Sequence, residues 1–332
     1  MSQTTLLITR EQVKSLLDMP TALKIVEQVY RSHGEGKVVM PTKITLDLGE
    51  GRPWPPYKGF MNAMPAYLGD VDIAGIKWAG GFQNNYKIGL PYISAMILLI
   101  NPKNGTFLAA MDGAYITAIR TGAASAVCAK VLARKDASML GIIGAGVQGR
   151  MHLRALQQVF KLKEVRVFDI KEGTAEKYRE QMTAELGLNI LPKRSYQEVV
   201  EGADVICTVT IGDEPMVKKE WLKTGSLIIS VGSYQELDPD VALSADKIVV
   251  DHWGQASHRG ELAKLVEAGK IGEKNIHAEI GEILSGKKKG REREDEDILA
   301  VPIGLGSVDI GCAFEVYRKA LDKKIGTPFS FI

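Results

Sequence analysis

The glycines near residue 144 are the first residues whose type and spacing could do chemistry. They lie in Gly144-Ala145-Gly146-Val147-Gln148-Gly149, directly after an apolar run, and apolar residues then recur at helical intervals. In a strand–turn–helix of this kind the first glycine permits a tight turn, the second lets the backbone approach a pyrophosphate, and the third lets the helix pack on the strand. The N–H groups at the start of that helix attract phosphates. We therefore predict that these six residues bind a dinucleotide.

An acidic residue ends the next apolar segment. Asp169 follows Val165–Phe168 about 20 residues after the glycines, where the ribose of a dinucleotide needs an acceptor. A carboxylate there repels a 2′-phosphate and so favours NAD(H), although Lys171 nearby keeps NADP(H) as an alternative. The competing interpretation of Asp169 is a strand-end acid that only caps the next turn.

The sequence after Ser138 has the rhythm of βαβ units, because short apolar runs alternate with amphipathic stretches. The expected strands are Met139–Ile143, Glu164–Phe168, Val205–Val209, Leu227–Val231 and Ile248–Val250. Parallel strands joined by right-handed crossovers form a doubly wound sheet with helices on both faces. The predicted fold class is therefore α/β, with a Rossmann-type dinucleotide-binding domain.

The first third of the chain has a mixed pattern instead. The spacing predicts one helix after the capping box Thr9–Gln12 and a second over about 21–33. The expected extended segments are Lys43–Leu48, Ile73–Trp78, Tyr92–Ile100 and Thr106–Met111, the last two joined as a hairpin. We expect an α+β domain here.

Length, charge and cysteine use narrow the class of protein. A chain of 332 residues exceeds what one hydrophobic core usually serves, which predicts two domains. The net charge of +2 argues against nucleic acid or a membrane as the main partner. Three widely spaced cysteines and the lack of an apolar run of ~20 residues favour the cytoplasm, with no metal site. The charge run Lys287–Asp297 is expected to be a solvated loop.

Several segments taken together resemble the ornithine cyclodeaminase and mu-crystallin family, which also includes an archaeal type of alanine dehydrogenase and reductases of cyclic imino acids. In matching order and spacing they are Met40–Lys43, Ala63–Ala66, Ala74–Trp78, Gly89–Pro91, Asp112–Thr117, Arg120–Ala123 and the Gly144 loop. The resemblance implies a substrate-binding and dimerisation domain of residues 1–125 together with 308–332, a Rossmann NAD-binding domain of residues 126–307, and a homodimer whose subunits share a sheet.

The resemblance also implies a site for a small amino or imino acid. In the family, basic side chains hold the substrate carboxylate, and the matching positions are Lys77 and Arg120, with Lys43 close by and Asn62 where some members have arginine. A guanidinium fork holds a carboxylate at two points, and an ammonium adds a second charge. Lys77 is also the candidate catalytic residue, which would donate a proton to the substrate nitrogen. The alternative for Arg120 is an ion pair at the domain interface.

Two further residues are candidates for binding the cofactor. The resemblance places Gly304 beside the nicotinamide, and Thr121 is the other candidate. A glycine-rich helix entry capped by Ser307 or Asp309 explains the residues around Gly304 equally well.

The loop after Val231 bears on the reaction. Cyclodeaminases place a catalytic aspartate there, whereas this shorter loop has Tyr234 and then Gln235, with Glu236 and Asp238 more plausibly capping the next helix. Hydride exchange between NADH and a C=N carbon needs less machinery than cyclodeamination. We therefore favour reduction of a cyclic ketimine such as 1-pyrroline-2-carboxylate to L-proline. The alternatives are alanine dehydrogenase, ornithine cyclodeaminase, and a non-catalytic NAD(P)H-binding protein similar to mu-crystallin.

Overall fold

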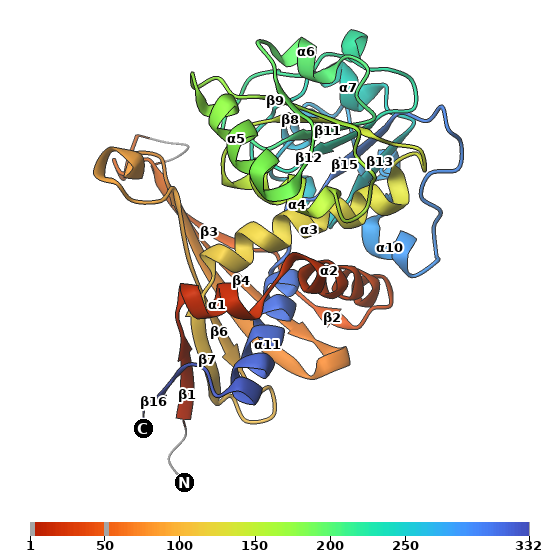
Figure 1. The fold of residues 1–332 in the computed structure, drawn as a ribbon. Helices are drawn as coiled ribbons and strands as arrows, with labels where there is room; N and C mark the ends of the chain where they lie inside the picture. Colours follow the sequence, from red (N-terminus) through yellow and green to blue (C-terminus); the bar gives the residue numbers. More distant parts are fainter. Residues whose placement is uncertain (1–3, 50–52, 332) are drawn as a thin grey trace. The chain divides into compact units, whose positions relative to one another are not determined.

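The computed structural model describes residues 4–49 and 53–331, and the chain divides into two units, each built around its own sheet (Figure 1). The first unit consists of Met1–Arg120 and Leu305–Ile332, and the second of Thr121–Gly304. Among the described residues, none of the helices is long and apolar enough to span a bilayer.

The unit boundaries fall a few residues before the expected ones, which were residues 125/126 and 307/308. Helix α3 (Ala114–Leu132) runs through the first boundary, and its part after Arg120 belongs with the second unit. The reason is close packing on helix α4 (Val147–Leu156): a Cβ on Gly122 would lie 2.6 Å from the carbonyl oxygen of Met151.

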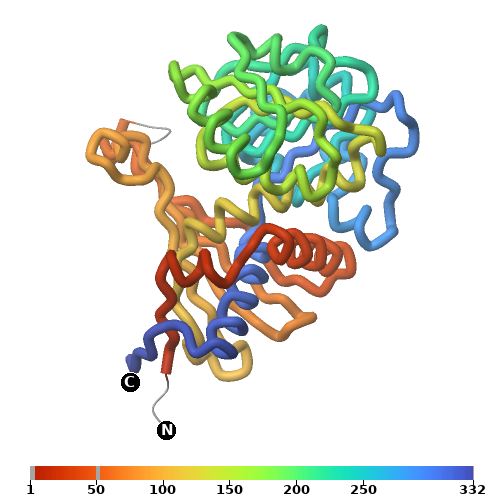
Figure 2. The backbone as a smooth tube through the Cα atoms, in the orientation of Figure 1, coloured from red at the N-terminus to blue at the C-terminus, as the bar shows by residue number. Residues whose placement is uncertain are grey.

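The first unit is a mixed sheet with helices against it. Its strands are β1 (Thr4–Ile8), β2 (Val38–Val39), β3 (Ile44–Leu48), β4 (Gly59–Leu68), β5 (Ile73–Phe82), β6 (Ile93–Ile100), β7 (Phe107–Asp112) and β16 (Thr327–Ser330). The helices are α1 (Arg10–Leu16), α2 (Met19–Gly34), the start of α3, and α11 (Gly306–Lys323). The order is β16-β1-β7-β6-β5-β4-β2, with β3 also on β4. Pairing of β1 with β16 brings the two ends of the chain side by side (Figure 2).

The expected helices and hairpin of this unit are confirmed, and four strands were missed, namely β1, β2, β4 and β16. Thr9 and Gln12 form the capping box of α1, and Asp18 caps α2, which therefore begins earlier than residue 21. Strand β4 was not predicted, and it contains Pro65, which cannot donate a ladder hydrogen bond. Pro65 is tolerated because it lies between the stretch of β4 that pairs with β3 and the stretch that pairs with β2.

Helix α11 covers one face of this sheet. It packs on β4, β5 and β6, with α2 beside it (Figure 1). The helix approaches closely because its first residue is glycine: a Cβ on Gly306 would lie 2.8 Å from the carbonyl oxygen of Met64. Side chains alternate between the faces of a strand, so Lys77 on β5 points to the covered face and is buried, whereas Trp78 is exposed.

The second unit is a doubly wound parallel sheet. Its strands are β8 (Met139–Ile143), β9 (Glu164–Phe168), β10 (Ile190–Pro192), β11 (Val205–Thr208), β12 (Leu227–Ser230), β13 (Lys247–Val250), β14 (Ala278–Glu279) and β15 (Ile298–Val301). The helices besides α4 are α5 (Thr174–Leu186), α6 (Tyr196–Val200), α7 (Pro239–Leu243), α8 (Trp253–Ala256), α9 (Ala263–Glu267) and α10 (Ile280–Leu284). The strand order is β10-β9-β8-β11-β12-β15-β13-β14. The chain adds strands toward one edge of the sheet from β8 to β10 and then toward the other edge from β11 onward, so the topological switch point lies between β8 and β11.

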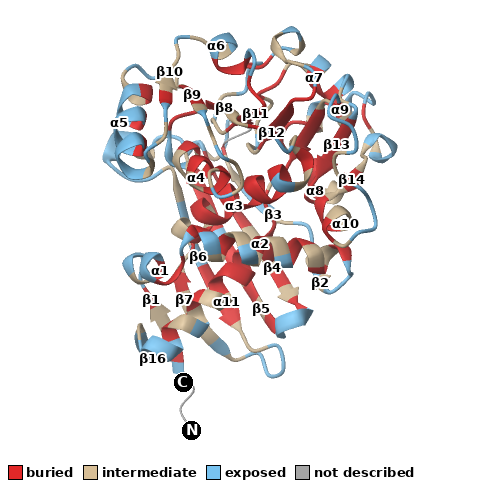
Figure 3. Cartoon of the chain, turned by 45° about the vertical axis from the view of Figure 1, so that its right-hand side comes forward, coloured by how far each residue is buried: buried red, intermediate tan, exposed pale blue. Residues whose placement is uncertain are grey.

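The predicted Rossmann-type α/β class is confirmed, as are all five predicted strands of the second unit. Three strands were missed, namely β10, β14 and β15, and each is only two to four residues long. Strand β15 lies between β12 and β13 and is buried along its length. Figure 3 shows the neighbouring strands β12 and β13, which are buried as well.

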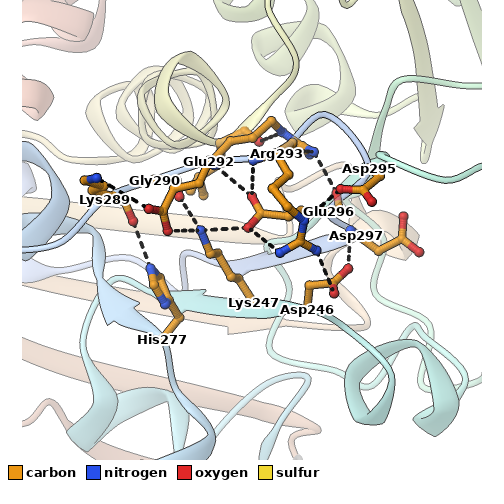
Figure 4. Close-up of polar contacts among 12 residues, drawn as sticks. Asp246, Lys247, His277, Lys289, Gly290, Glu292, Arg293, Asp295, Glu296 and Asp297 are labelled. Atoms are coloured by element: carbon orange, nitrogen blue, oxygen red, sulfur yellow. Dashed lines mark hydrogen bonds and ion pairs between the residues drawn. The ribbon is translucent and has the colours of Figure 1, made fainter.

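The charge run before β15 is not simply a solvated loop, which corrects the sequence-based expectation. Lys247, at the start of β13, donates to the carbonyl oxygen of Gly290 at 2.7 Å and to Glu292 at 3.0 Å, and it pairs with Glu296 at 2.9 Å (Figure 4). Glu296 is 2 % exposed. The loop before β15 is therefore held by buried ion pairs with Lys247. The charge run alone had suggested only a solvated loop.

Candidate cofactor and substrate sites

The three glycines of the Gly144 loop differ in backbone conformation and in the space around them, and these differences match the roles that the motif predicts. Gly144 has φ +107°, in the region that favours glycine, and it follows β8 directly. A Cβ on Gly149 would lie 2.2 Å from the carbonyl oxygen of Gly144, so this glycine is needed for packing within the loop. Around Gly146, by contrast, a Cβ would meet no atom within 4 Å. This open position is the N-cap of α4, and the N–H groups at such a helix start attract anions.

Asp169 is held against the same loop. One carboxylate oxygen accepts a hydrogen bond from the Ala145 N–H at 2.9 Å, and the other accepts from the Lys171 N–H at 2.9 Å. Each oxygen keeps a further lone pair for a ribose hydroxyl. Beside this acid, Ile170 is 79 % exposed, and Ile211 after β11 is 61 % exposed. These apolar side chains suit the flat face of a base.

Buried contacts fix the positions of α3 and α4 in the second unit. The Ser125 hydroxyl lies 2.8 Å from Nε2 of His152, whose Nδ1 lies 2.8 Å from the carbonyl oxygen of Gln148. Burial lowers the pKa of His152 to about 4, which keeps the imidazole neutral. Thr121 is buried on α3, one residue before the Gly122 contact. Val147 begins α4 and is exposed.

Gly304 has φ +95°, and its N–H donates to Asp251 at 2.6 Å. Asp251 directly follows β13, as Asp169 directly follows β9, and it was not singled out in the sequence. An acid immediately after a short apolar run was the signal that could have found it. The positive φ of Gly304 is therefore needed for the turn that leads into Leu305. This need exists whether or not a nicotinamide lies beside Gly304.

Two buried glutamates tie together the loops that follow β11 and β12. Glu236 accepts from the Thr210 N–H at 2.8 Å and from its hydroxyl at 2.6 Å. Glu261 accepts from the Ser230 hydroxyl at 3.0 Å and from the Glu236 N–H at 2.9 Å. Burial raises the pKa of both carboxyls, that of Glu261 to about 7. Asp238 caps α7 as expected, but Glu236 does not, because its side chain turns into the interior.

In the first unit, Lys77 and Arg120 meet on one carboxylate. Nζ of Lys77 lies 2.6 Å from Oδ2 of Asp309, and Nε of Arg120 donates to Oδ1 at 2.8 Å. All three side chains are buried. Burial lowers the pKa of Lys77 to about 8, the Asp309 charge opposes this, and the Arg120 charge adds to it.

The helix-cap interpretation of Asp309 and Ser307 was wrong. Helix α11 begins after Leu305 with no side-chain cap, and Ser307 instead lies 2.7 Å from Nε2 of His33. Asp309 is the counterion of both predicted substrate-binding cations. Sequence reasoning missed this role, although an acid within the apolar run of α11 is an unusual residue that needs a buried partner.

Asn62 lies on β4, and Lys43 lies directly before β3. Asn62 is buried on β4 and pairs in register with Ala79, two residues from Lys77 and therefore on the same face. Its Oδ1 accepts from the Thr45 hydroxyl at 2.7 Å. Lys43 lies directly before β3 and is partly buried. The structure thus brings Lys77 and Arg120 together around Asp309, while Asn62 is bonded to the neighbouring strand.

Comparison with known proteins agrees with this architecture. The sequence profile of the ornithine cyclodeaminase/mu-crystallin family matches residues 3–324. The alanine dehydrogenase of Archaeoglobus fulgidus is 38 % identical over 331 residues, which cover 98 % of either chain. The structure of an archaeal alanine dehydrogenase dimer with bound NAD has a TM-score of 0.92 at 38 % identity, covering 99 % of this chain and 100 % of that one.

A reductase structure is equally similar. The Thermococcus litoralis Δ1-pyrroline-2-carboxylate reductase, in complex with NADH and L-proline, has a TM-score of 0.92 at 37 % identity, covering 97 % of this chain and 99 % of that one. A family match over nearly the whole length, together with relatives well above 30 % identity, defines the class. The chain belongs to the ornithine cyclodeaminase/mu-crystallin family.

Proposed function

We propose that the chain reduces a small cyclic imino acid with NADH, with Δ1-pyrroline-2-carboxylate to L-proline as the reference reaction. The observation that carries this proposal is the buried cluster of Lys77, Arg120 and Asp309. Two cations on one carboxylate leave a net positive charge in a buried place, and a substrate carboxylate would neutralise it. The similarity to the Thermococcus litoralis reductase supports the same substrate class.

The chain is an NAD-dependent oxidoreductase. Similar proteins have been solved with bound NAD and NADH, and the residues of this chain fit the same cofactor. The open space at Gly146 accommodates a pyrophosphate, and Asp169 offers a ribose acceptor that opposes a 2′-phosphate. Bound NADH supplies the hydride. We assign cofactor binding to Gly144, Ala145, Gly146, Val147, Gln148, Gly149 and Asp169, with Thr121 and Gly304 as further contacts.

The remaining chemistry falls to residues of the first unit. Arg120 presents a planar fork for the substrate carboxylate, and Lys43 and Asn62 contribute a charge and an amide from the neighbouring strands. Reduction of a C=N bond also needs one proton at nitrogen. Lys77 can give it, because an ammonium with a pKa of about 8 is charged at neutral pH yet a stronger acid than an ordinary lysine.

Alanine dehydrogenase is the second candidate, favoured by the relative in Archaeoglobus fulgidus. A held carboxylate and a proton donor serve that reaction as well. Ornithine cyclodeaminase is less well supported, because the loop from Val231 to Gln235 contains no acid and Glu236 is turned inward. A binding protein similar to mu-crystallin would keep NAD(P)H affinity without turnover.

We further propose that the second unit binds the cofactor and that the first binds substrate and forms a homodimer. Ile44, Trp78 and Met96 lie in one row across β3, β5 and β6, on the face opposite α11, and all three are exposed. An apolar sheet face of this kind is typical of a subunit interface. The similar archaeal alanine dehydrogenase with bound NAD is a dimer. Three buried free thiols fit a reducing compartment, for which we propose the cytoplasm.

The reaction is tested by following NADH absorbance with purified protein and three substrates: Δ1-pyrroline-2-carboxylate, Δ1-piperideine-2-carboxylate, and pyruvate with ammonia. Ornithine with catalytic NAD⁺ is run in parallel and assayed for proline. NADH loss with a cyclic imine alone supports the proposal. Turnover only with pyruvate and ammonia would establish alanine dehydrogenase, and proline formed from ornithine without net NADH change would establish the cyclodeaminase.

A further inference from the structure

The carboxylate of Asp309 is the only described anion bonded to either Lys77 or Arg120 within residues 4–49 and 53–331. It is completely buried, and the side chains of Lys77 and Arg120 are 2 % and 6 % exposed. Lys77 approaches one carboxylate oxygen and Arg120 the other. A carboxylate shared in this way fixes the direction of both cations at once.

The close approach of α11 makes this contact. Met64, whose carbonyl oxygen limits Gly306 to glycine, is the register partner of Lys77 on β5. Asp309 lies one helical turn after Gly306, so the helix must rest directly on the sheet for the carboxylate to reach Nζ. On its two neighbouring strands Lys77 faces Met64 and Ile97, which cannot ionise. The charged groups that act on it are Asp309 on α11 and Arg120 on α3.

Arg120 bonds to Asp309 through Nε, which leaves its terminal nitrogens Nη1 and Nη2 available for a ligand. Nε alone donates to Asp309, and the described residues provide no hydrogen bond to Nη1 or Nη2. A guanidinium has five N–H donors, so four remain on the terminal nitrogens. Two parallel bonds from these nitrogens are what a carboxylate ligand accepts.

We propose that Asp309 is the positioning residue of the substrate site: it keeps Lys77 charged and directed, and it turns the terminal edge of Arg120 toward the substrate carboxylate. This inference rests on the proposed function, since it assigns a role within the same site. Asp309 itself touches neither substrate nor cofactor in this scheme. During reduction the hydride goes to the imine carbon and the Lys77 proton to the imine nitrogen, after which water reprotonates the amine of Lys77.

The pH dependence follows from the charges around Lys77. Burial and Arg120 lower its pKa, and only Asp309 raises it. Without the Asp309 charge, Lys77 would lose its proton at lower pH, and the alkaline limb of kcat/KM would move with it. A nearby opposite charge typically shifts a pKa by about 1–3 units, so we expect a movement of about one unit or more.

The test is the Asp309→Asn variant of the full chain, assayed with NADH and Δ1-pyrroline-2-carboxylate across pH. We expect the alkaline limb to move to lower pH and KM for the imine to rise by about tenfold, with NADH affinity unchanged by fluorescence titration. Asp309→Glu should recover part of both effects. An Asp309→Asn profile and KM equal to those of the unmodified protein would overturn the proposal.

Asp204→Asn is the matched control. Asp204 also joins an arginine and a lysine, Arg134 at 3.0 Å and Lys223, and it is similarly buried. It lies in the second unit, where its Oδ2 also accepts from the N–H of Met139 at the start of β8. Loss of this charge should lower the melting temperature without moving the alkaline limb or KM. An equal effect of both variants would mean that Asp309 acts only through stability.

A readout without turnover separates this inference from the proposed function. The pKa of Lys77 can be measured by NMR on protein with ¹³C-labelled lysine ε-carbons, using Lys77→Arg to assign the signal. A lower pKa in Asp309→Asn supports the role of Asp309 even if no imine is reduced, in which case the proposed reaction is the part that fails. An unchanged pKa overturns the role of Asp309 whatever the protein reduces.

Discussion

Replacing Gly146 with alanine should separate cofactor affinity from stability, and the two should change in opposite directions. Gly146 has φ −78° and ψ −157°, an extended conformation that alanine can adopt, and its added Cβ would meet no protein atom within 4 Å. Gly→Ala at a compatible position stabilises a protein by about 0.4–1 kcal/mol, because the unfolded chain loses freedom. In a unit of this size the melting temperature should rise by about 1–4 °C.

NADH affinity of the same variant should fall. If the pyrophosphate approaches the Gly146 backbone, the new methyl group occupies its place, and we expect at least a tenfold loss, which is about 1.4 kcal/mol. The assay is a fluorescence titration with NADH beside thermal unfolding of the protein without ligand. Affinity equal to that of the unmodified protein would refute the assignment of this space to the cofactor.

Two matched variants complete this experiment. Gly149→Ala places its Cβ 2.2 Å from the carbonyl oxygen of Gly144, so backbone must move and both stability and affinity should fall. Gly272→Ala adds a methyl group whose nearest neighbour is 4.0 Å away, also in extended backbone, and should leave NADH affinity unchanged. A lower melting temperature for Gly146→Ala, as for Gly149→Ala, would show that Gly146 serves packing instead.

Three further outcomes are expected. His152→Gln should differ most in its free energy of unfolding from the unmodified protein above pH 6.5. The pKa of His152 is lowered to about 4 in the folded protein, so its stabilisation is present above pH 6.5 and is lost as the pH falls toward 4. Urea unfolding should show a loss on the order of 3 kcal/mol across that window. Asp169→Ser should narrow the preference for NADH over NADPH in fluorescence titrations, and an unchanged ratio would argue against a ribose contact. Trp78→Glu should give monomers in light scattering, whereas Leu321→Glu, a similarly exposed position on α11, should not.

Sequence patterns predicted the strand, turn and helix that carry the proposed cofactor site because these elements lie in consecutive residues. A strand, a tight turn and a helix start place Gly144, Gly146 and Gly149 in fixed relation, so spacing alone indicates their separate roles. Asp169 was predictable for the same reason, since it ends the next strand and adjacent parallel strands bring their ends together. Strands β10 and β14 escaped because two or three residues carry too little periodicity, and β15 escaped because it directly follows the charge run.

The ion cluster of the proposed substrate site was only partly predictable because its contacts are long-range. Lys77, Arg120 and Asp309 come from a strand and two helices far apart in the chain. A lysine in an apolar strand indicates that a buried partner exists, but sequence does not say which acid it is. The pairing depends on how closely α11 rests on the sheet at Gly306, and that distance follows from packing. Glu236 and Glu261 were missed for the same reason.

In the parallel sheet of the second unit, charged side chains lie at both ends of the strands. The end at which a charged side chain lies helps to distinguish candidate binding residues from residues that only stabilise the fold. Asp169, Asp251 and Glu236 follow β9, β13 and β12, and ligands of doubly wound sheets bind at these carboxyl ends of the strands. Asp204 bonds to the start of β8, and Lys247 begins β13, at the opposite edge. Both of these side chains are buried in ion pairs, as Asp309 is, so burial alone does not identify a site. Asp309 is distinguished because Lys77 and Arg120 are themselves buried and have no second anion among the described residues, whereas Arg134 of the Asp204 cluster also pairs with Asp136.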